Sequence, residues 1–151
     1  MKFVATEDIS APIDRVWSRV SDIEGFEMRL RSRVDGLTRT PPGPPAEGTT
    51  WTGRADVMGK KREMKMVLGK MQAPARLEAE AATDGMAVTL DVELAELGPR
   101  LTRMTVTTEA RARSLTARLM LQSAKLARQS MAKRYRTRVA DFAAKVEKGA
   151  A

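Results

Sequence analysis

The chain has 151 residues, of which 42% are hydrophobic, and its 27 basic and 19 acidic residues give a formal net charge of +8. It contains neither cysteine nor histidine, which excludes disulfides, thiolate nucleophiles, zinc sites built on Cys, and Ser-His-Asp or Cys-His catalysis within the chain. At this length we expect one domain over residues 1–151, and no clustered Asp and Glu motif predicts a metal site.

The start of the chain predicts a strand followed by a short amphipathic helix. Lys2 to Ile9 has the pattern of a strand, Ser10 is the expected N-cap, and Pro12 lies in the first turn, where its missing N–H costs nothing. One apolar stripe then recurs at i, i+3, i+4 and i+7: Ile13, Val16, Trp17 and Val20. We expect residues 22–25 to end this helix and a second short helical turn to cover residues 26–30.

The middle of the chain predicts an antiparallel meander. Residues 34–39 have the pattern of an edge strand, and the prolines of residues 41–45 cannot continue a sheet. Over residues 49–113 apolar and polar side chains alternate, which predicts one apolar face and one face toward water. Turn signals separate the expected strands: Gly59-Lys60, Ala73-Pro74, Asp84-Gly85 and Gly98-Pro99.

Residues 114–148 contain neither glycine nor proline and predict a long helix across the apolar face of the sheet. Unbroken, such a helix would be about 52 Å long at 1.5 Å per residue. Its apolar stripe has three-to-four spacing: Met120, Ala124, Ala127, Met131, Tyr135, Val139, Phe142 and Val146. Three leucines should widen the stripe at its N-terminal end: Leu115, Leu119 and Leu126.

The whole excess of positive charge lies in the C-terminal segment. From Arg111 to Lys148 there are 11 basic and 2 acidic residues, whereas residues 1–110 hold 16 basic and 17 acidic residues. Two interpretations stay open: a solvated helix face, or a dock for an anionic membrane surface or an acidic protein. We expect no nucleic acid partner, because the segment has few aromatic residues and no nucleic-acid-binding motif.

The sequence resembles proteins of the START-like, or SRPBCC, superfamily of polyketide cyclase/dehydrase and lipid-transport proteins. The resemblance rests on Ser10-Ala11-Pro12, Val16-Trp17, Asp22, Gly48 before the strand with Trp51, and Ala73-Pro74. It implies an α+β helix-grip fold, in which a curved antiparallel sheet carries two short N-terminal helices and a long C-terminal helix packed across it. Within the superfamily the chain looks most like small bacterial polyketide cyclase/dehydrase proteins or proteins similar to the G-type subunit of carbon monoxide dehydrogenase. The catalytic His, Asp or Arg sets of some cyclase-type relatives have no match to carry over.

The fold implied by the resemblance places an apolar cavity between the sheet and the C-terminal helix. The residues expected to line it are Trp51, Met64, Met66, Leu90, Met104, Leu119, Met120 and Tyr135. Methionine adapts to ligands of varied shape, and Trp51 would supply a flat wall with one N–H donor. The same pattern also describes a filled core, and Tyr135 is either a donor to a ligand carbonyl or a core residue.

The leading hypothesis is a binding protein for a lipid-like or other apolar small molecule, with no catalytic residue, metal or cofactor. One alternative is a polyketide cyclase or dehydratase, which would need an ionisable group inside the cavity. Asp91, Glu93 and Glu109 lie on expected strands, and the alternation places Asp91 and Glu93 outward. The other alternative is an accessory protein that docks on an anionic membrane through the basic C-terminal segment.

The expected location is cytoplasmic, with the periphery of the membrane left open. No apolar run approaches the roughly 20 residues of a transmembrane helix. The chain also starts with a strand pattern that contains Glu7 and Asp8, which does not fit a signal peptide.

Overall fold

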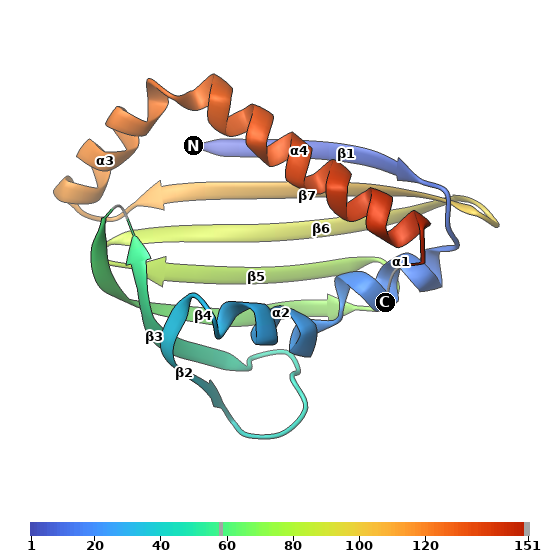
Figure 1. The fold of residues 1–151 in the computed structure, drawn as a ribbon, viewed down its shortest axis with the longest axis horizontal. Helices are drawn as coiled ribbons and strands as arrows, with labels where there is room; N and C mark the ends of the chain where they lie inside the picture. Colours follow the sequence, from blue (N-terminus) through green and yellow to red (C-terminus); the bar gives the residue numbers. More distant parts are fainter. Residues whose placement is uncertain (58, 150–151) are drawn as a thin grey trace.

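A seven-stranded antiparallel sheet forms the frame of the molecule (Figure 1). The computed structural model describes residues 1–57 and 59–149. The strands are β1 (Lys2–Ile9), β2 (Val34–Thr40), β3 (Thr50–Val57), β4 (Lys60–Gln72), β5 (Arg76–Thr83), β6 (Met86–Gly98) and β7 (Leu101–Ala112). Their order across the sheet is β1-β7-β6-β5-β4-β3-β2, so β2 is an edge strand, as its low apolar content predicted.

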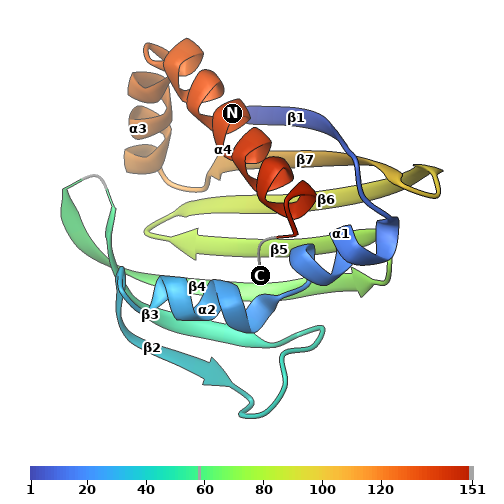
Figure 2. The ribbon, with the colours of Figure 1, turned by 45° about the vertical axis from the view of Figure 1, so that its right-hand side comes forward.

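Two pairs of helices complete the fold: α1 (Ile13–Val20) and α2 (Ile23–Leu30) after β1, and α3 (Leu115–Lys125) and α4 (Arg128–Glu147) after β7. On the concave face α4 crosses β1, β7 and β6, while α2 lies over β3 and β4 (Figures 1 and 2). This arrangement confirms the α+β helix-grip fold. None of the described helices is both long and apolar enough to cross a bilayer.

The core follows from the period-two pattern of the strands. Inward positions of neighbouring strands pair directly, as Leu77 does with Val92 and Leu94 with Met104. Full burial of one such side chain stabilises the fold by roughly 1.5–3 kcal/mol. The large buried apolar residues come from every layer: Ile9, Val16, Val20, Trp51, Leu68, Leu77, Val92, Leu94, Met104, Val106, Val139 and Val146.

Both N-terminal helices begin at residues other than those expected. Pro12, not Ser10, is the N-cap of α1, and it makes no side-chain hydrogen bond. The Ser10 backbone N–H instead donates to Glu147 Oε1 over 2.9 Å, which ties the start of α1 to the end of α4. Asp22 does not end α1, because the Asp22 carboxylate accepts from the Gly25 backbone N–H over 3.1 Å and caps α2.

The single helix expected over residues 114–148 is wrong, because the chain turns at Leu126 and Ala127 between α3 and α4. The end of α4 is anchored, since Val146 is fully buried and its carbonyl accepts from Arg15 Nη2 over 2.7 Å. A straight helix from there would span about 52 Å. The longest strands have 13 residues, or roughly 44 Å. The turn folds α3 back beside the end of β7, which leaves the three leucines of the expected stripe exposed.

Candidate ligand cavity

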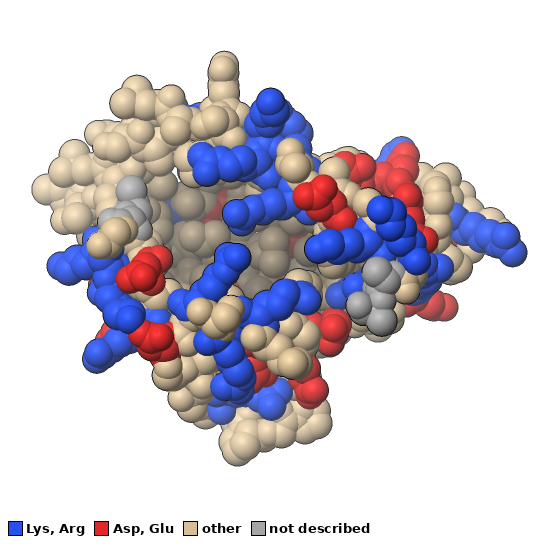
Figure 3. Space-filling view, viewed as in Figure 1, with Lys and Arg blue, Asp and Glu red and all other residues tan. Residues whose placement is uncertain are grey.

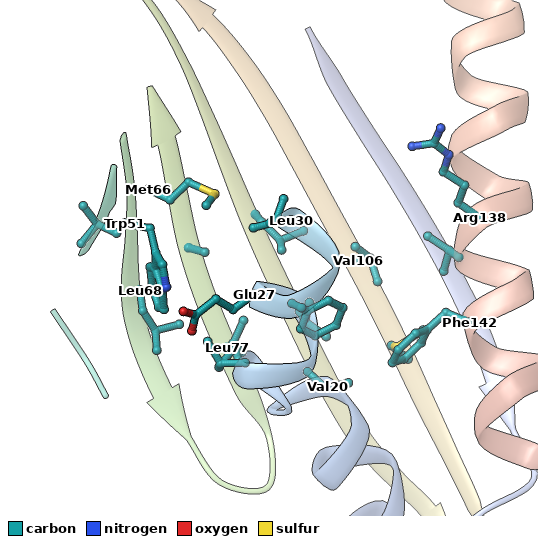
Figure 4. Close-up of a pocket in the computed structure, with 18 of the residues that line it drawn as sticks. Val20, Glu27, Leu30, Trp51, Met66, Leu68, Leu77, Val106, Arg138 and Phe142 are labelled. Atoms are coloured by element: carbon teal, nitrogen blue, oxygen red, sulfur yellow. The ribbon is translucent and has the colours of Figure 1, made fainter. Parts of the chain in front are cut away.

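A cavity of about 480 Å³ lies between the concave face of the sheet and the helices. Figure 3 shows it as a hollow at the centre of one face, and Figure 4 shows the side chains around it. The sheet contributes Trp51, Met66, Val67, Leu68, Leu77, Ala79, Leu90, Val92, Met104 and Val106. The helices contribute Val20, Ile23, Phe26, Glu27, Leu30, Tyr135, Arg138, Val139 and Phe142. The volume falls within the range of small-molecule sites, roughly 300–1,000 Å³.

Five of the eight residues expected at the cavity lie in its wall: Trp51, Met66, Leu90, Met104 and Tyr135. Met64 lies on the same face of β4 as Met66 but nearer the β3–β4 turn, where it lines a separate polar depression. Leu119 and Met120 belong to α3, and neither lines the cavity because α3 turns away from the concave face. That any of these residues contacts a ligand stays a prediction.

The hydroxyl of Tyr135 is hydrogen-bonded to the sheet. The hydroxyl donates to the Val106 carbonyl over 3.0 Å and lies 3.0 Å from Thr108 Oγ1, which in this arrangement donates to it. Burial raises the pKa of Tyr135, and the Thr108 hydrogen bond partly opposes this rise. With its proton committed to Val106, Tyr135 presents mainly its ring to the cavity, which favours the core interpretation over a hydrogen bond to a ligand.

Glu27 is the acidic residue of the cavity wall, and it was not among the residues expected there. It is only 5% exposed, and its carboxylate points from α2 toward the side of Trp51 and Leu68 (Figure 4). Glu27 Oε1 accepts from Arg31 Nη2 over 2.7 Å, and Oε2 lies 3.3 Å from Arg39 Nη1. A carboxylate in an apolar wall is costly to bury unless it is paired, and the two arginines provide that pairing.

A signal for Glu27 was present in the helix pattern. Ile23, Glu27 and Leu30 stand at i, i+4 and i+7, so Glu27 lies within the apolar stripe of α2. An acidic residue in such a stripe must either be buried or interrupt the packing of the helix. The position of Glu27 in this stripe therefore predicts one carboxylate in the cavity wall.

Further polar atoms lie beside Glu27. Arg39 pairs with Trp51 in the β2–β3 register, so the two side chains share one face of the sheet. Apart from the ion pair with Glu27, the buried Arg39 Nη1 has no hydrogen-bond partner among the described residues, and neither has the buried Trp51 Nε1. One end of the cavity is therefore more polar than its apolar walls, while Arg138 reaches the cavity from α4 (Figure 4).

The carboxylates of the central strands lie outside the cavity, as the alternation predicted. Leu90 and Val92 line the cavity, and Asp91 between them pairs on the opposite face with Arg76 over 2.9 Å. Glu93 lies 3.9 Å from the same guanidinium. Among residues 1–57 and 59–149 no group of three or more acidic side chains is placed to hold a metal ion.

The curved sheet, the crossing helix and the open cavity between them define a protein of the SRPBCC class. A family model for polyketide cyclase / dehydrase and lipid transport proteins matches residues 1–147, and the chain belongs to this family. No curated protein sequence matches the chain.

Solved structures share the fold at low sequence identity. Truncated norcoclaurine synthase from Thalictrum flavum superposes with a TM-score of 0.67 at 12% identity, covering 97% of this chain and 92% of that one. The ZhuI aromatase/cyclase from Streptomyces sp. R1128 gives 0.63 at 16% identity, covering 98% and 94%. A START superfamily protein from Mycobacterium smegmatis gives 0.56 at 16% identity, covering 93% and 98%.

Proposed function

We propose that the protein binds a lipid-like or other apolar small molecule in the cavity between the sheet and α4, without catalysing a reaction. The observation that carries this proposal is a cavity of about 480 Å³ whose walls are mainly apolar. A single water occupies about 30 Å³ of liquid volume, so side chains leave far more room here than packing defects do. Met66 and Met104 in the wall can adapt to ligands of different shape.

Native mass spectrometry of protein purified without added ligand tests this proposal. We expect a reproducible extra mass that is lost when the same sample is denatured. The binding of a neutral apolar fluorophore, N-phenyl-1-naphthylamine, provides a second measurement, and a bound natural ligand should compete with it. Protein that carries no adduct and does not bind the fluorophore would contradict the proposal.

A second candidate is an enzyme of the cyclase or dehydratase type, and Glu27 is the observation that favours it. A carboxylate in a cavity wall can remove a proton from the carbon next to a ketone, which is the first step of an aldol cyclisation. Glu27 is buried at the cavity, so the ionisable group that such an enzyme requires is present. One solved structure of the same fold is named as an aromatase/cyclase, and this supports testing the activity.

Deuterium exchange of 2-tetralone in heavy water separates the two candidates. An enzyme should accelerate exchange at the carbon next to the ketone above the buffer rate, and Glu27→Gln should remove the acceleration while the ketone still binds. A binding protein should bind the ketone and leave its exchange at the buffer rate in both variants. Glu24→Gln is the matched control, since Glu24 is an exposed carboxylate of the same helix.

A further inference from the structure

The helix α3 turns large apolar side chains to solvent and a small one to the protein. Ala117 is fully buried, whereas Leu115 and Leu119 are 73% and 57% exposed, and Leu126 at the following turn is 92% exposed. At about 100° per residue the three leucines fall within roughly 40° of one another, opposite Ala117. Single exposed leucines are ordinary, but a stripe of them along one helix marks an interaction surface.

Basic side chains border this leucine stripe (Leu115, Leu119 and Leu126). Arg118 and Lys125 lie along one flank of it on α3, and Arg128, Lys133 and Arg134 follow in the first turns of α4, all exposed. Figure 3 shows an area without charged side chains over α3 beside lysines and arginines over α4. Among the ion pairs of the described residues, none uses a basic residue of α3 or α4.

We propose that α3 and the first turns of α4 dock the protein on an anionic lipid bilayer. The leucine stripe enters the acyl region, and the bordering basic side chains meet the phosphate groups of the lipids. An exposed helix stripe suits a fluid surface, because lipids adapt to its shape. A second copy is a poorer occupant, since it would bring two strongly basic segments together.

Docking in this way holds the cavity near the bilayer. α4 runs from the docking surface to the cavity wall, where it supplies Tyr135, Val139 and Phe142. Apolar small molecules partition into membranes. In the docked protein, α4 would therefore extend from the membrane that holds such a ligand to the cavity that binds it. The docking surface itself requires no ligand in the cavity, and docking can therefore be tested independently of ligand binding.

Vesicle flotation with the full chain tests the proposal. We expect binding to phosphatidylcholine vesicles with about 30% phosphatidylglycerol. Binding to phosphatidylcholine alone should be weak. Raising the salt from about 0.1 M to about 0.5 M should weaken binding, because the Debye length shortens. The variant L115S/L119S/L126S should lower partitioning at least about tenfold, and R118Q/K125Q/R128Q should lower both binding and its salt dependence.

Matched controls lie at the far end of the molecule, on the β6–β7 hairpin (Figure 1). Leu97 and Arg100 are exposed there, so Leu97→Ser and Arg100→Gln should bind vesicles as the wild type does. If circular dichroism shows that the triple leucine variant does not fold, the single variant Leu126→Ser replaces it in the flotation test. The Leu126 side chain is almost fully exposed, so its substitution should not disturb the fold.

Three results would overturn the proposal. The wild type could fail to float with anionic vesicles, or the leucine variants could float as well as the wild type. The third is a dimer in solution that the leucine substitutions dissociate, while vesicle binding stays unchanged. That result would assign the stripe to a second copy of the chain.

Discussion

Glu27 and Tyr135 are polar side chains of the cavity wall, and they differ in the partners that hold their polar atoms. The Tyr135 hydroxyl has both of its hydrogen bonds within the protein, to Val106 and Thr108. Glu27 is held by ion pairs with Arg31, which follows the end of α2, and with Arg39 of β2. Tyr135 therefore fixes α4 to the sheet, while Glu27 and Arg138 are the charged side chains in the cavity wall.

The titration of Tyr135 reports its burial directly, because it is the chain's one tyrosine. Burial raises its pKa above the ordinary value of 10.0, and the Thr108 hydrogen bond opposes this. We therefore expect the ultraviolet absorbance of the phenolate to develop at higher pH in the folded protein than in urea. Coincident titrations in the two states would contradict the burial of this hydroxyl.

The same shift predicts how stability depends on pH. A raised pKa in the folded state means that the phenol contributes its full stability below about pH 10, the unfolded value, and loses it as the pH rises through the folded value. Tyr135→Phe should cost about 1 kcal/mol at neutral pH through the lost hydrogen bond to Val106. Its urea midpoint should then fall less steeply than that of the wild type above about pH 10. Equal slopes would contradict the prediction.

At the scale of elements, α2 places Phe26, Glu27 and Leu30 in the cavity wall, and Asp22 caps this helix. Asp22→Ala should lower the free energy of unfolding by about 1 kcal/mol, because it removes the acceptor for the Gly25 N–H. Urea denaturation measures this change. Ser10→Ala is the control and should change stability by less than about 0.5 kcal/mol, since the Ser10 side chain does not cap α1. The opposite order of effects would show that Ser10 is the cap.

The strands were more predictable than the helix ends. The first strand was predicted with its observed bounds, and all four turn signals fall where strands end or between strands. The side chains of a strand alternate between the two faces of the sheet, so a shift of one residue would move every side chain to the opposite face. Helix ends depend on single contacts, and Ser10 and Asp22 are both good caps by residue type. Which of them caps a helix depends on the path of the backbone.

The leucines of α3 could not be placed from their spacing. Periodicity predicts which side chains share a helix face, and Leu115, Leu119 and Leu126 do share one. It does not predict whether that face meets the sheet, which the turn at Leu126 and Ala127 decides here. The cavity residues on β3, β4 and β7 were predictable because the sheet leaves each strand one inward face.

At the scale of the whole molecule, the cavity arises because two helices cover the curved sheet from different sides. α4 packs over β1, β7 and β6, and α2 packs over β3 and β4, so the central strand β5 lies beneath neither helix (Figure 2). A small side chain on β5 enlarges this space. Ala79 lies at its floor, paired with Leu68 on one side and Leu90 on the other.

Ala79→Leu tests whether this space binds a ligand or is incidental to the packing. The larger side chain should occupy part of the cavity without opening the sheet, so the free energy of unfolding should change by no more than about 1 kcal/mol. Binding of N-phenyl-1-naphthylamine should fall at least about tenfold, because the ligand loses contact area and volume. Ala95→Leu is the matched control: Ala95 is exposed on the outer face of β6, so its substitution should leave binding unchanged. A filled variant that binds the fluorophore as tightly as the wild type would place the ligand elsewhere on the molecule.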